Sequence, residues 1–321
     1  MLAHQWISFM ERTMGARSST LAAASAAVLL ALALALPASV QAGNHGERLP
    51  MAPEEGQMVA LVTGSTSGLG KEVARQLAAH GVHVIVHGRN IERGELLVEE
   101  IEEAGGSARF YPADFALMAN VQELANRIKE DYDRLDLLLN NAGLSARGTE
   151  EAQITDDGNE LLLQVNYLSH FLLTHELLPM LQASAPARII HTASGAQAPL
   201  DFDDPNMENN YTSGRAYGQS KLAQITYSNA LARRIEGTGV TTVSLHPGTF
   251  MPTRMVLGAG IEPQDDLEVG VNAIMNLITS KEIENGAYFN RQEQARAHDQ
   301  AYDEEAQRKL WELSERLVGT R

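Results

Sequence analysis

The stretch that decides the fold is Met58-Val-Ala-Leu-Val-Thr-Gly-Ser-Thr-Ser-Gly-Leu-Gly70. Its first five residues form an apolar run typical of a buried strand, and a helical pattern extends from Leu69 to His80. The glycines between them allow the chain to turn sharply and to approach a diphosphate closely. The start of the helix then points free N–H groups at the phosphates. This strand–turn–helix order predicts a dinucleotide-binding loop, whereas glycines alone would fit any flexible turn.

The residues expected to hold the diphosphate lie within this turn. We predict backbone contacts from the three glycines and from the leucine between the last two. The two serine hydroxyls are expected to add hydrogen-bond donors. The predicted phosphate-binding residues are Gly64, Ser65, Ser67, Gly68, Leu69 and Gly70.

The end of the second expected strand indicates which dinucleotide is bound. An NAD site usually has a carboxylate there, about 20 residues after the glycines, that binds the ribose 2′-hydroxyl. Here the sequence is His87-Gly-Arg-Asn90, and it contains no carboxylate. A guanidinium pairs strongly with phosphate, so Arg89 favours NADP(H) as the cofactor. The alternative is that Arg89 is an ordinary exposed arginine.

Apolar runs and helical patterns alternate through the rest of the chain, as is typical of βαβ units. We therefore predict an α/β fold with a single Rossmann-type, doubly wound parallel sheet and helices on both faces. This domain should span residues 57–321, after a linker at 43–56, with a surface loop at 201–214. Strands are expected at 58–62, 82–86, 108–111, 135–139, 188–191, 240–245 and 287–289, and helices at 69–80, 91–104, 117–132, 158–182, 216–235, 266–280 and 302–317.

The first 42 residues differ in composition from the rest of the chain. An apolar run of 16 residues, Leu21 to Leu36, precedes small residues at Val40 and Ala42. A bilayer span needs about 20 residues. We therefore interpret the segment first as a secretory signal peptide cleaved after Ala42, and second as an N-terminal anchor that associates with a membrane. The predicted location is exported, periplasmic or membrane-anchored, but cytoplasmic if translation starts at Met51.

Composition excludes several classes of function. The formal net charge is −16, which argues against a nucleic-acid partner because phosphate contacts need a basic surface. The chain has no cysteine, so disulfides, cysteine nucleophiles and thiolate metal sites are excluded. Its ten histidines lack metal-binding spacing; His83 and His87 share a strand face, and we interpret them as solvated or packed. We predict no metal site, and the absence of a GxSxG motif argues against an acyl hydrolase.

Tyr217 and Lys221 have the chemistry that hydride transfer to a carbonyl requires. The carbonyl oxygen gains negative charge during this transfer, so a group in the site must supply a proton. A free phenol has a pKa near 10, but Lys221 lies one helical turn beyond Tyr217, and its charge should lower the pKa of that phenol. Of eight tyrosines, only Tyr217 has a lysine four positions later. In isolation such a pair would usually be a surface feature, but this one follows a phosphate loop.

Six short segments and residues occur in a particular order along the chain. They are Thr63–Gly70, Asn140–Gly143, Asn166, Ser194, Tyr217–Lys221 and Pro247-Gly248. Together they resemble the classical short-chain dehydrogenase/reductase family over nearly the whole chain from Met58. Residues 164–171 and 310–314 are similar to the retinol-dehydrogenase group within that family. The resemblance implies an oxidoreductase that transfers a hydride between NADP(H) and a small-molecule alcohol or carbonyl.

The resemblance also implies a role for each remaining site residue. Ser194 would orient the substrate oxygen, Asn166 would support a proton path to Lys221, and Lys221 would also bind the cofactor ribose beside Tyr217. A threonine or serine often follows Pro-Gly to hold the nicotinamide carboxamide; here Thr249 is too early and Thr253 is one position late, so that role stays open. Further cofactor contacts are implied for Asp114, Asn141, Ala142, Gly143, Pro247 and Gly248.

Other functions fit parts of the pattern. A non-catalytic NADP(H)-binding regulatory protein would share the fold, but such proteins usually lose the tyrosine or the lysine. A sugar-nucleotide epimerase would resemble TGxxGxxG, whereas this chain has TGxxxGxG. Apolar residues within 250–257 favour a lipophilic substrate of retinoid, steroid or aliphatic type, and an apolar loop that covers core explains them equally well. Family members are often homo-oligomers, a state that the sequence leaves open.

Overall fold

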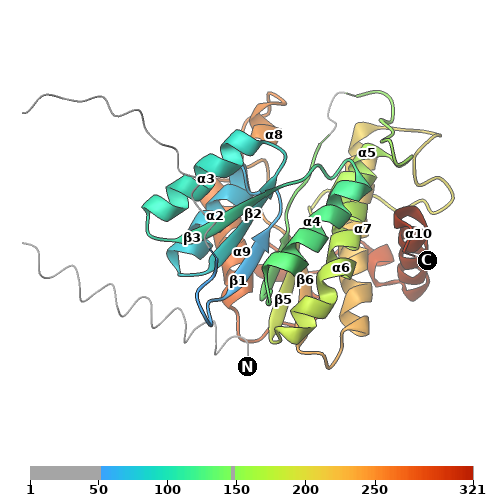
Figure 1. The fold of residues 1–321 in the computed structure, drawn as a ribbon. Helices are drawn as coiled ribbons and strands as arrows, with labels where there is room; N and C mark the ends of the chain where they lie inside the picture. Colours follow the sequence, from blue (N-terminus) through green and yellow to red (C-terminus); the bar gives the residue numbers. More distant parts are fainter. Residues whose placement is uncertain (1–51, 146–148, 321) are drawn as a thin grey trace, which may run out of the picture.

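The computed structural model describes residues 52–145 and 149–320 (Figure 1). The predicted signal or anchor at 1–42, and most of the predicted linker at 43–56, lie outside these ranges. Within the described residues, no helix is both long and apolar enough to cross a bilayer.

One eight-stranded sheet forms the centre of the molecule, in the order β3-β2-β1-β4-β5-β6-β7-β8. Every neighbouring pair is parallel except β7 and β8. The predicted Rossmann-type parallel sheet is therefore confirmed. The strands are β1 (Val59–Val62), β2 (His83–Gly88), β3 (Ser107–Pro112), β4 (Leu137–Asn140), β5 (Ala187–Thr192), β6 (Val240–His246), β7 (Tyr288–Asn290) and β8 (Glu293–Ala295).

Helices cover both faces of the sheet, because its central strands are apolar on both sides (Figure 1). Along β1, Val59 and Leu61 face one apolar core while Ala60 and Val62 face the other. One face is covered by α2 (Gly68–Ala79), α3 (Ile91–Glu103) and α9 (Leu267–Thr279), and the other by α4 (Met118–Asp131), α6 (Ser169–Ala183) and α7 (Ser213–Arg234).

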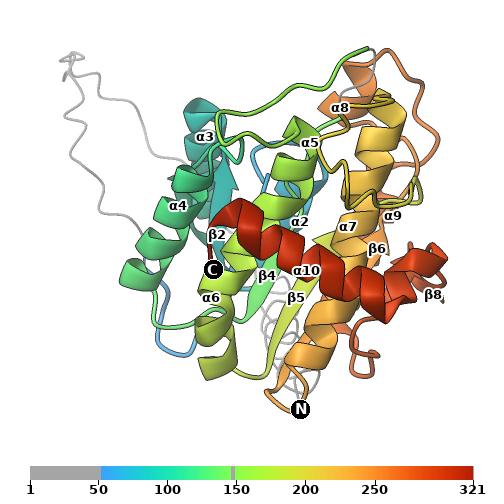
Figure 2. The same ribbon diagram turned by 90° about the vertical axis from the view of Figure 1, so that its right-hand side faces the viewer.

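The C-terminal helix α10 (Glu304–Val318), preceded by the 3-10 turn Asp299–Tyr302, lies across α6 and α7 (Figure 2). Its Trp311 packs edge-on against Phe171, with ring centroids 5.3 Å apart. The hydroxyls of Tyr167 and Ser314 are hydrogen-bonded at 2.6 Å. The helix therefore covers apolar surface that α6 and α7 would otherwise expose to water.

Three local features differ from the sequence prediction. The helix expected from 158 begins at Leu161, as the short α5 (Leu161–Leu163), because the Glu160 side chain accepts the Leu163 N–H and caps it. It then passes through a π-helical turn, Gln164–Leu168, before α6. The short helix α8 (Arg254–Leu257) and the edge strand β8 were not predicted, because each has too few residues to show a periodicity.

The chain order places a crevice at one edge of the sheet. Strands β2 and β3 extend to one side of β1, whereas β4, β5 and β6 extend to the other. Connections therefore leave β1 and β4 in opposite directions at their carboxyl ends. Ligands of doubly wound sheets bind at this kind of switch point.

Candidate active site

A cavity of about 1190 Å³ lies at the carboxyl ends of the strands and is lined by segments that follow β1, β2, β3, β4, β5 and β6. We call the part formed by the loop 64–70 and by residues 87–93 the nucleotide end. The part formed by Ser194, Tyr217 and Lys221 is called the catalytic end. All the predicted site residues except Ser65 and Asn166 line this one cavity.

The phosphate loop at the nucleotide end is packed too tightly for side chains at its glycines. A Cβ on Gly64 would lie 2.7 Å from the Ala142 Cα, and Gly64 has a φ of +66° that favours glycine. A Cβ on Gly70 would lie 2.5 Å from the Asn141 side-chain nitrogen. The loop therefore sits directly against the Asn141-Ala142-Gly143 turn that follows β4.

Thr63 connects these two segments. Its hydroxyl accepts hydrogen bonds from the backbone N–H groups of Asn141, at 2.8 Å, and Ala142, at 2.9 Å. Asn141 in turn donates from its side chain to the Thr63 carbonyl at 2.9 Å. The end of β1 thus fixes the turn after β4, and both present backbone to the cavity.

Of the two serines predicted as donors, only one faces the cavity. Ser67 precedes α2 and makes no capping bond to it, so its hydroxyl is available at the phosphate loop. Ser65 is fully buried: its hydroxyl donates to the Val62 carbonyl at 2.8 Å and accepts from the His87 N–H at 3.0 Å. The expectation that the Ser65 hydroxyl binds phosphate is therefore wrong, because it links β1 to β2 instead. Thr66, which was not among the predicted contacts, also lines the cavity.

Two arginines lie beside the nucleotide end. Arg89 is exposed and stands 3.7 Å from the Asp114 carboxylate. Such an exposed pair is weak, so the guanidinium is available to a ligand phosphate. Arg93 also lines this end; it lies in the first turn of α3, four residues after Arg89, which precedes the helix. This spacing is visible in the sequence. The structure therefore places two positive charges where the sequence predicted one.

His87 is packed rather than solvated, and so is His83. The Nδ1 atom of His87 accepts a hydrogen bond from the Gly64 N–H at 3.2 Å, and its ring stacks on Phe115 with centroids 4.4 Å apart. Burial lowers the pKa of His87 to about 4, so the ring is neutral near pH 7 and supports the phosphate loop from behind.

At the catalytic end, Tyr217 and Lys221 lie one turn apart on α7. The Lys221 ammonium is 5.7 Å from the centre of the Tyr217 ring. It donates to the Thr192 carbonyl and to the Gln224 side-chain oxygen, both at 2.9 Å. Burial lowers the pKa of Lys221 to about 7. Neither Thr192 nor Gln224 was selected from the sequence.

Asn166 lies in the π-helical turn and is fully buried. Its side-chain oxygen accepts the Leu144 N–H at 2.7 Å, and its side-chain nitrogen donates to the Ser220 hydroxyl at 2.9 Å. A Cβ on Gly143 would lie 3.3 Å from the Asn166 oxygen and 3.6 Å from the Lys221 nitrogen. Asn166, Gly143 and Lys221 therefore meet at one point beneath the cavity.

Ser194 follows β5 and is held at its backbone. Its carbonyl accepts hydrogen bonds from the Tyr288 hydroxyl at 3.2 Å and from the Gln197 amide at 3.1 Å. Its hydroxyl oxygen accepts the Ala196 N–H at 3.1 Å, which leaves the hydroxyl proton free to donate into the cavity. Tyr288 and Gln197 carry no motif and could not be found from the sequence.

The segment after Pro247-Gly248 distinguishes the two threonines that the sequence left open. The Thr249 hydroxyl is hydrogen-bonded to the His246 ring at 3.1 Å. The Thr253 side chain lies against the phosphate loop, since a Cβ on Gly68 would be 3.2 Å from its methyl carbon. Between the two threonines, Phe250 has a φ of +45°. Thr253 is therefore the threonine that reaches over the loop.

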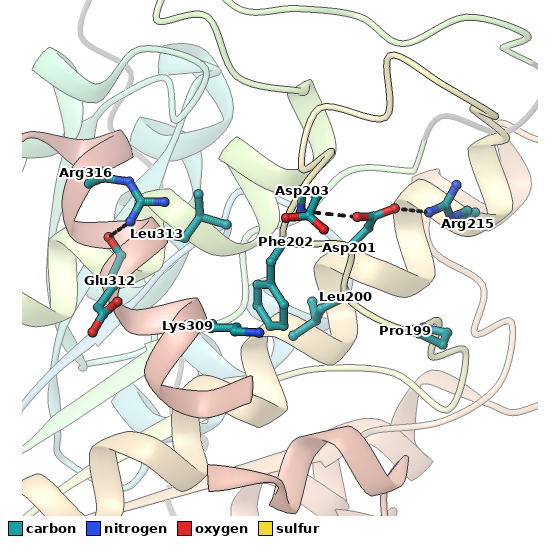
Figure 3. Close-up of a pocket in the computed structure, with 10 residues that line it drawn as sticks. All are labelled: Pro199, Leu200, Asp201, Phe202, Asp203, Arg215, Lys309, Glu312, Leu313 and Arg316. Atoms are coloured by element: carbon teal, nitrogen blue, oxygen red, sulfur yellow. Dashed lines mark hydrogen bonds and ion pairs between the residues drawn. The ribbon is translucent and has the colours of Figure 1, made fainter. Parts of the chain in front are cut away.

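A second cavity of about 590 Å³ lies between residues 199–203, the start of α7 and α10 (Figure 3). None of the predicted site residues lines it. Arg215 is paired with Asp201 at 3.1 Å, and Arg316 donates to the Glu312 carbonyl at 3.3 Å. Both arginines that line this second cavity therefore already have partners within the protein.

Comparisons with known proteins agree with this geometry. Residues 58–260 match the short chain dehydrogenase family. The chain is 36% identical to human retinol dehydrogenase 13, over 81% of this chain and 84% of that protein. It is 34% identical to human retinol dehydrogenase 14, over 92% of this chain and 98% of that protein.

Solved structures share the same fold. The RhlG protein of Pseudomonas aeruginosa, determined as an active-site complex with NADP, is 28% identical, with a TM-score of 0.61 over 75% of this chain and 95% of that one. An uncharacterized protein from Mycobacterium paratuberculosis is 26% identical, with a TM-score of 0.68 over 84% of this chain and 96% of that one.

Proposed function

This protein belongs to the short-chain dehydrogenase/reductase family, within its retinol-dehydrogenase-like group, and we propose that it is an NADP(H)-dependent enzyme with Tyr217 as its acid–base residue. It is an oxidoreductase that acts on an alcohol or carbonyl group. The observation that carries the proposal is a single cavity with a glycine-rich loop at one end and Tyr217, Lys221 and Ser194 at the other.

The residues at the nucleotide end fit NADP(H). The backbone of the phosphate loop and the start of α2 would hold the diphosphate, together with the Ser67 hydroxyl. Arg89 and Arg93 would bind the ribose 2′-phosphate, which their charge complements. Thr253 would support the nicotinamide side. The NADP complex of the Pseudomonas aeruginosa relative favours the same cofactor here.

The residues at the catalytic end would complete the reaction. The bound cofactor supplies or accepts the hydride. Tyr217 donates the proton to the substrate oxygen in reduction and accepts it in oxidation. The Lys221 ammonium stabilises the phenolate form of Tyr217, and the Ser194 hydroxyl donates a hydrogen bond to the substrate oxygen. Asn166 holds the Leu144 backbone and the Ser220 hydroxyl on α7, and so keeps α7 and Gly143 in place around Lys221.

A lipophilic substrate fits the apolar wall formed by the segment that follows β6. Phe250, Met251, Met255, Val256 and Ile261 line this part of the cavity. Met255 is 39% exposed, so its apolar side chain is open to a ligand in this part of the cavity. The names of the retinol dehydrogenase relatives favour the same substrate class.

The proposal is tested by incubating the purified protein with NADPH and a panel of retinoid, steroid and aliphatic carbonyls. We expect NADPH oxidation with at least one lipophilic member and slower turnover with NADH. Tyr217→Phe should abolish that turnover, whereas Tyr302→Phe, which removes a hydroxyl that accepts only the Ala297 N–H, should retain it. NADPH binding without turnover on the whole panel would instead support a regulatory protein.

A further inference from the structure

Lys221 carries its charge in an unusual setting. The residue is 4% exposed and forms no ion pair with any other described residue. A buried ammonium normally needs a carboxylate nearby. The buried carboxylates among the described residues, Asp136 and Glu160, are engaged elsewhere, with Arg134 and with the Leu163 N–H.

Two neutral oxygens take the place of a carboxylate. The Lys221 ammonium has three donors, and two of them are used by the Thr192 carbonyl and the Gln224 side-chain oxygen, both at 2.9 Å. Because these two bonds fix the ammonium in space, they also fix the direction of its third donor. Thr192 accepts through its backbone carbonyl, which a substitution at that position would keep. Gln224 accepts through its side chain, so a substitution there removes the hydrogen bond.

The environment of Gln224 holds its amide in one orientation. The ammonium can only donate, so the amide oxygen must face Lys221 and the amide nitrogen must face away. On that side lies the His170 ring, with its Nδ1 atom 3.4 Å from the Gln224 nitrogen; because this Nδ1 carries a proton, it accepts no hydrogen bond from the amide, whose orientation is set by Lys221. The Nδ1–H of His170 donates to the Asn166 carbonyl at 2.9 Å, and its Nε2 lies 3.2 Å from the Thr63 hydroxyl. Gln224 is 1% exposed and enclosed by these groups.

We propose that Gln224 is a positioning residue that keeps the Lys221 ammonium charged and directed toward Tyr217 and the cavity. The inference rests on the proposed function of Tyr217 and Lys221 and adds a residue to it. Gln224 touches no reacting atom; it acts through Lys221. A neutral acceptor suits this role because a carboxylate would place a negative charge beside the phenolate that Lys221 must stabilise.

The titratable groups around the ammonium do not replace Gln224. Tyr217 lies on the same helix, His170 faces Lys221 from α6, and His191 on β5 directly precedes Thr192, whose carbonyl accepts from Lys221. Burial keeps the pKa of His170 and His191 below the ordinary value, so both rings are neutral near pH 7. Neither ring accepts a hydrogen bond from Lys221 in the structure.

The test is an ultraviolet titration of the Tyr217 phenolate with NADP⁺ bound, which requires no knowledge of the substrate. Each protein is titrated with and without the additional substitution Tyr217→Phe. The difference between the two titrations is the signal of Tyr217. In Gln224→Met, which has a similar volume and only a weak thioether acceptor, we expect the midpoint to rise by about one pH unit, because a hydrogen bond to a charged group is worth about 1.5 kcal/mol. Gln224→Glu should also raise the midpoint, through the charge of its carboxylate.

Gln307→Met is the matched control. Gln307 is an equally buried amide, 3% exposed, that donates to the Ala301 carbonyl outside the active-site cavity. This variant should leave the Tyr217 midpoint unchanged, even if it lowers the thermal stability. An unchanged midpoint in folded Gln224→Met overturns the inference and leaves the proposed function intact. If Tyr217→Phe retains full turnover, the proposed function fails, and this inference fails with it.

Discussion

The two ends of the active-site cavity are built from different parts of the chain. The nucleotide end consists mainly of backbone, with Gly64 and Gly70 pressed against the turn at Asn141 and Ala142. The catalytic end consists of side chains, each supported by a residue behind it, such as Gln224 behind Lys221 and Tyr288 behind Ser194. Backbone sites tolerate almost no added volume, whereas side-chain sites depend on the chemistry of their supports. Substitutions at the two ends should therefore fail in different ways.

The largest effect is expected from Gly64→Ala at the nucleotide end. Its Cβ would lie 2.7 Å from the Ala142 Cα at a φ of +66°, so overpacking and backbone strain add together. We expect NADPH affinity to fall on the order of 100-fold, measured by fluorescence titration.

Gly105→Ala separates the two causes. Gly105 has a φ of +80°, but a Cβ there would meet nothing within 4 Å. This variant should lose about 1 kcal/mol of stability from strain alone and bind NADPH normally. Equal losses of affinity in both variants would contradict the account of the phosphate loop.

A second prediction concerns the pH dependence of the free energy of unfolding, and it involves histidines at both ends of the cavity. His87 at the nucleotide end and His191 behind the catalytic end are buried, which lowers the pKa of His87 to about 4 and that of His191 to about 3. The unfolded chain binds these protons at about pH 6.5. The free energy of unfolding should therefore be highest above pH 6.5 and decrease as the pH falls toward 4, by up to about 3 kcal/mol for each histidine.

Urea unfolding at pH 7.5, 5.5 and 4.5 measures this decrease. His87→Asn should reduce the slope against pH, whatever it does to the stability at pH 7.5. His175→Asn, at an exposed position, is the surface control. A stability that stays constant between pH 6.5 and 4.5 would show that these rings are not held neutral by the fold.

A smaller loss of NADPH affinity is expected when one arginine beside the cofactor's 2′-phosphate is removed. Arg89→Ala removes an exposed guanidinium beside Asp114, while Arg93 remains at the same end. NADPH affinity should fall about tenfold, with NADH affinity nearly unchanged. Arg75→Ala, which breaks a surface pair with Glu72, is the control. An equal loss for NADPH and NADH would place Arg89 away from the 2′-phosphate.

The contrast between the ends also explains what the sequence could predict. Alternating apolar runs and helical patterns, glycine spacing and the Tyr217–Lys221 pair are local patterns, so the parallel sheet could be predicted from them, together with a set of site residues most of which line the cavity. The supports at Gln224, Tyr288 and Gln197 come together only through tertiary packing and have no local pattern. Ser65 was assigned to phosphate because its position in the loop does not reveal that its hydroxyl binds the β1 and β2 backbones.

The central claim is that Tyr217 acts in the chemical step. Stopped-flow measurement of a single turnover of bound NADPH, with a saturating carbonyl that the wild type reduces, tests it directly. For Tyr217→Phe we expect NADPH affinity within about threefold of wild type and a hydride-transfer rate lower by about 100-fold or more. A transfer rate equal to that of wild type, in a variant that binds NADPH normally, would contradict the account.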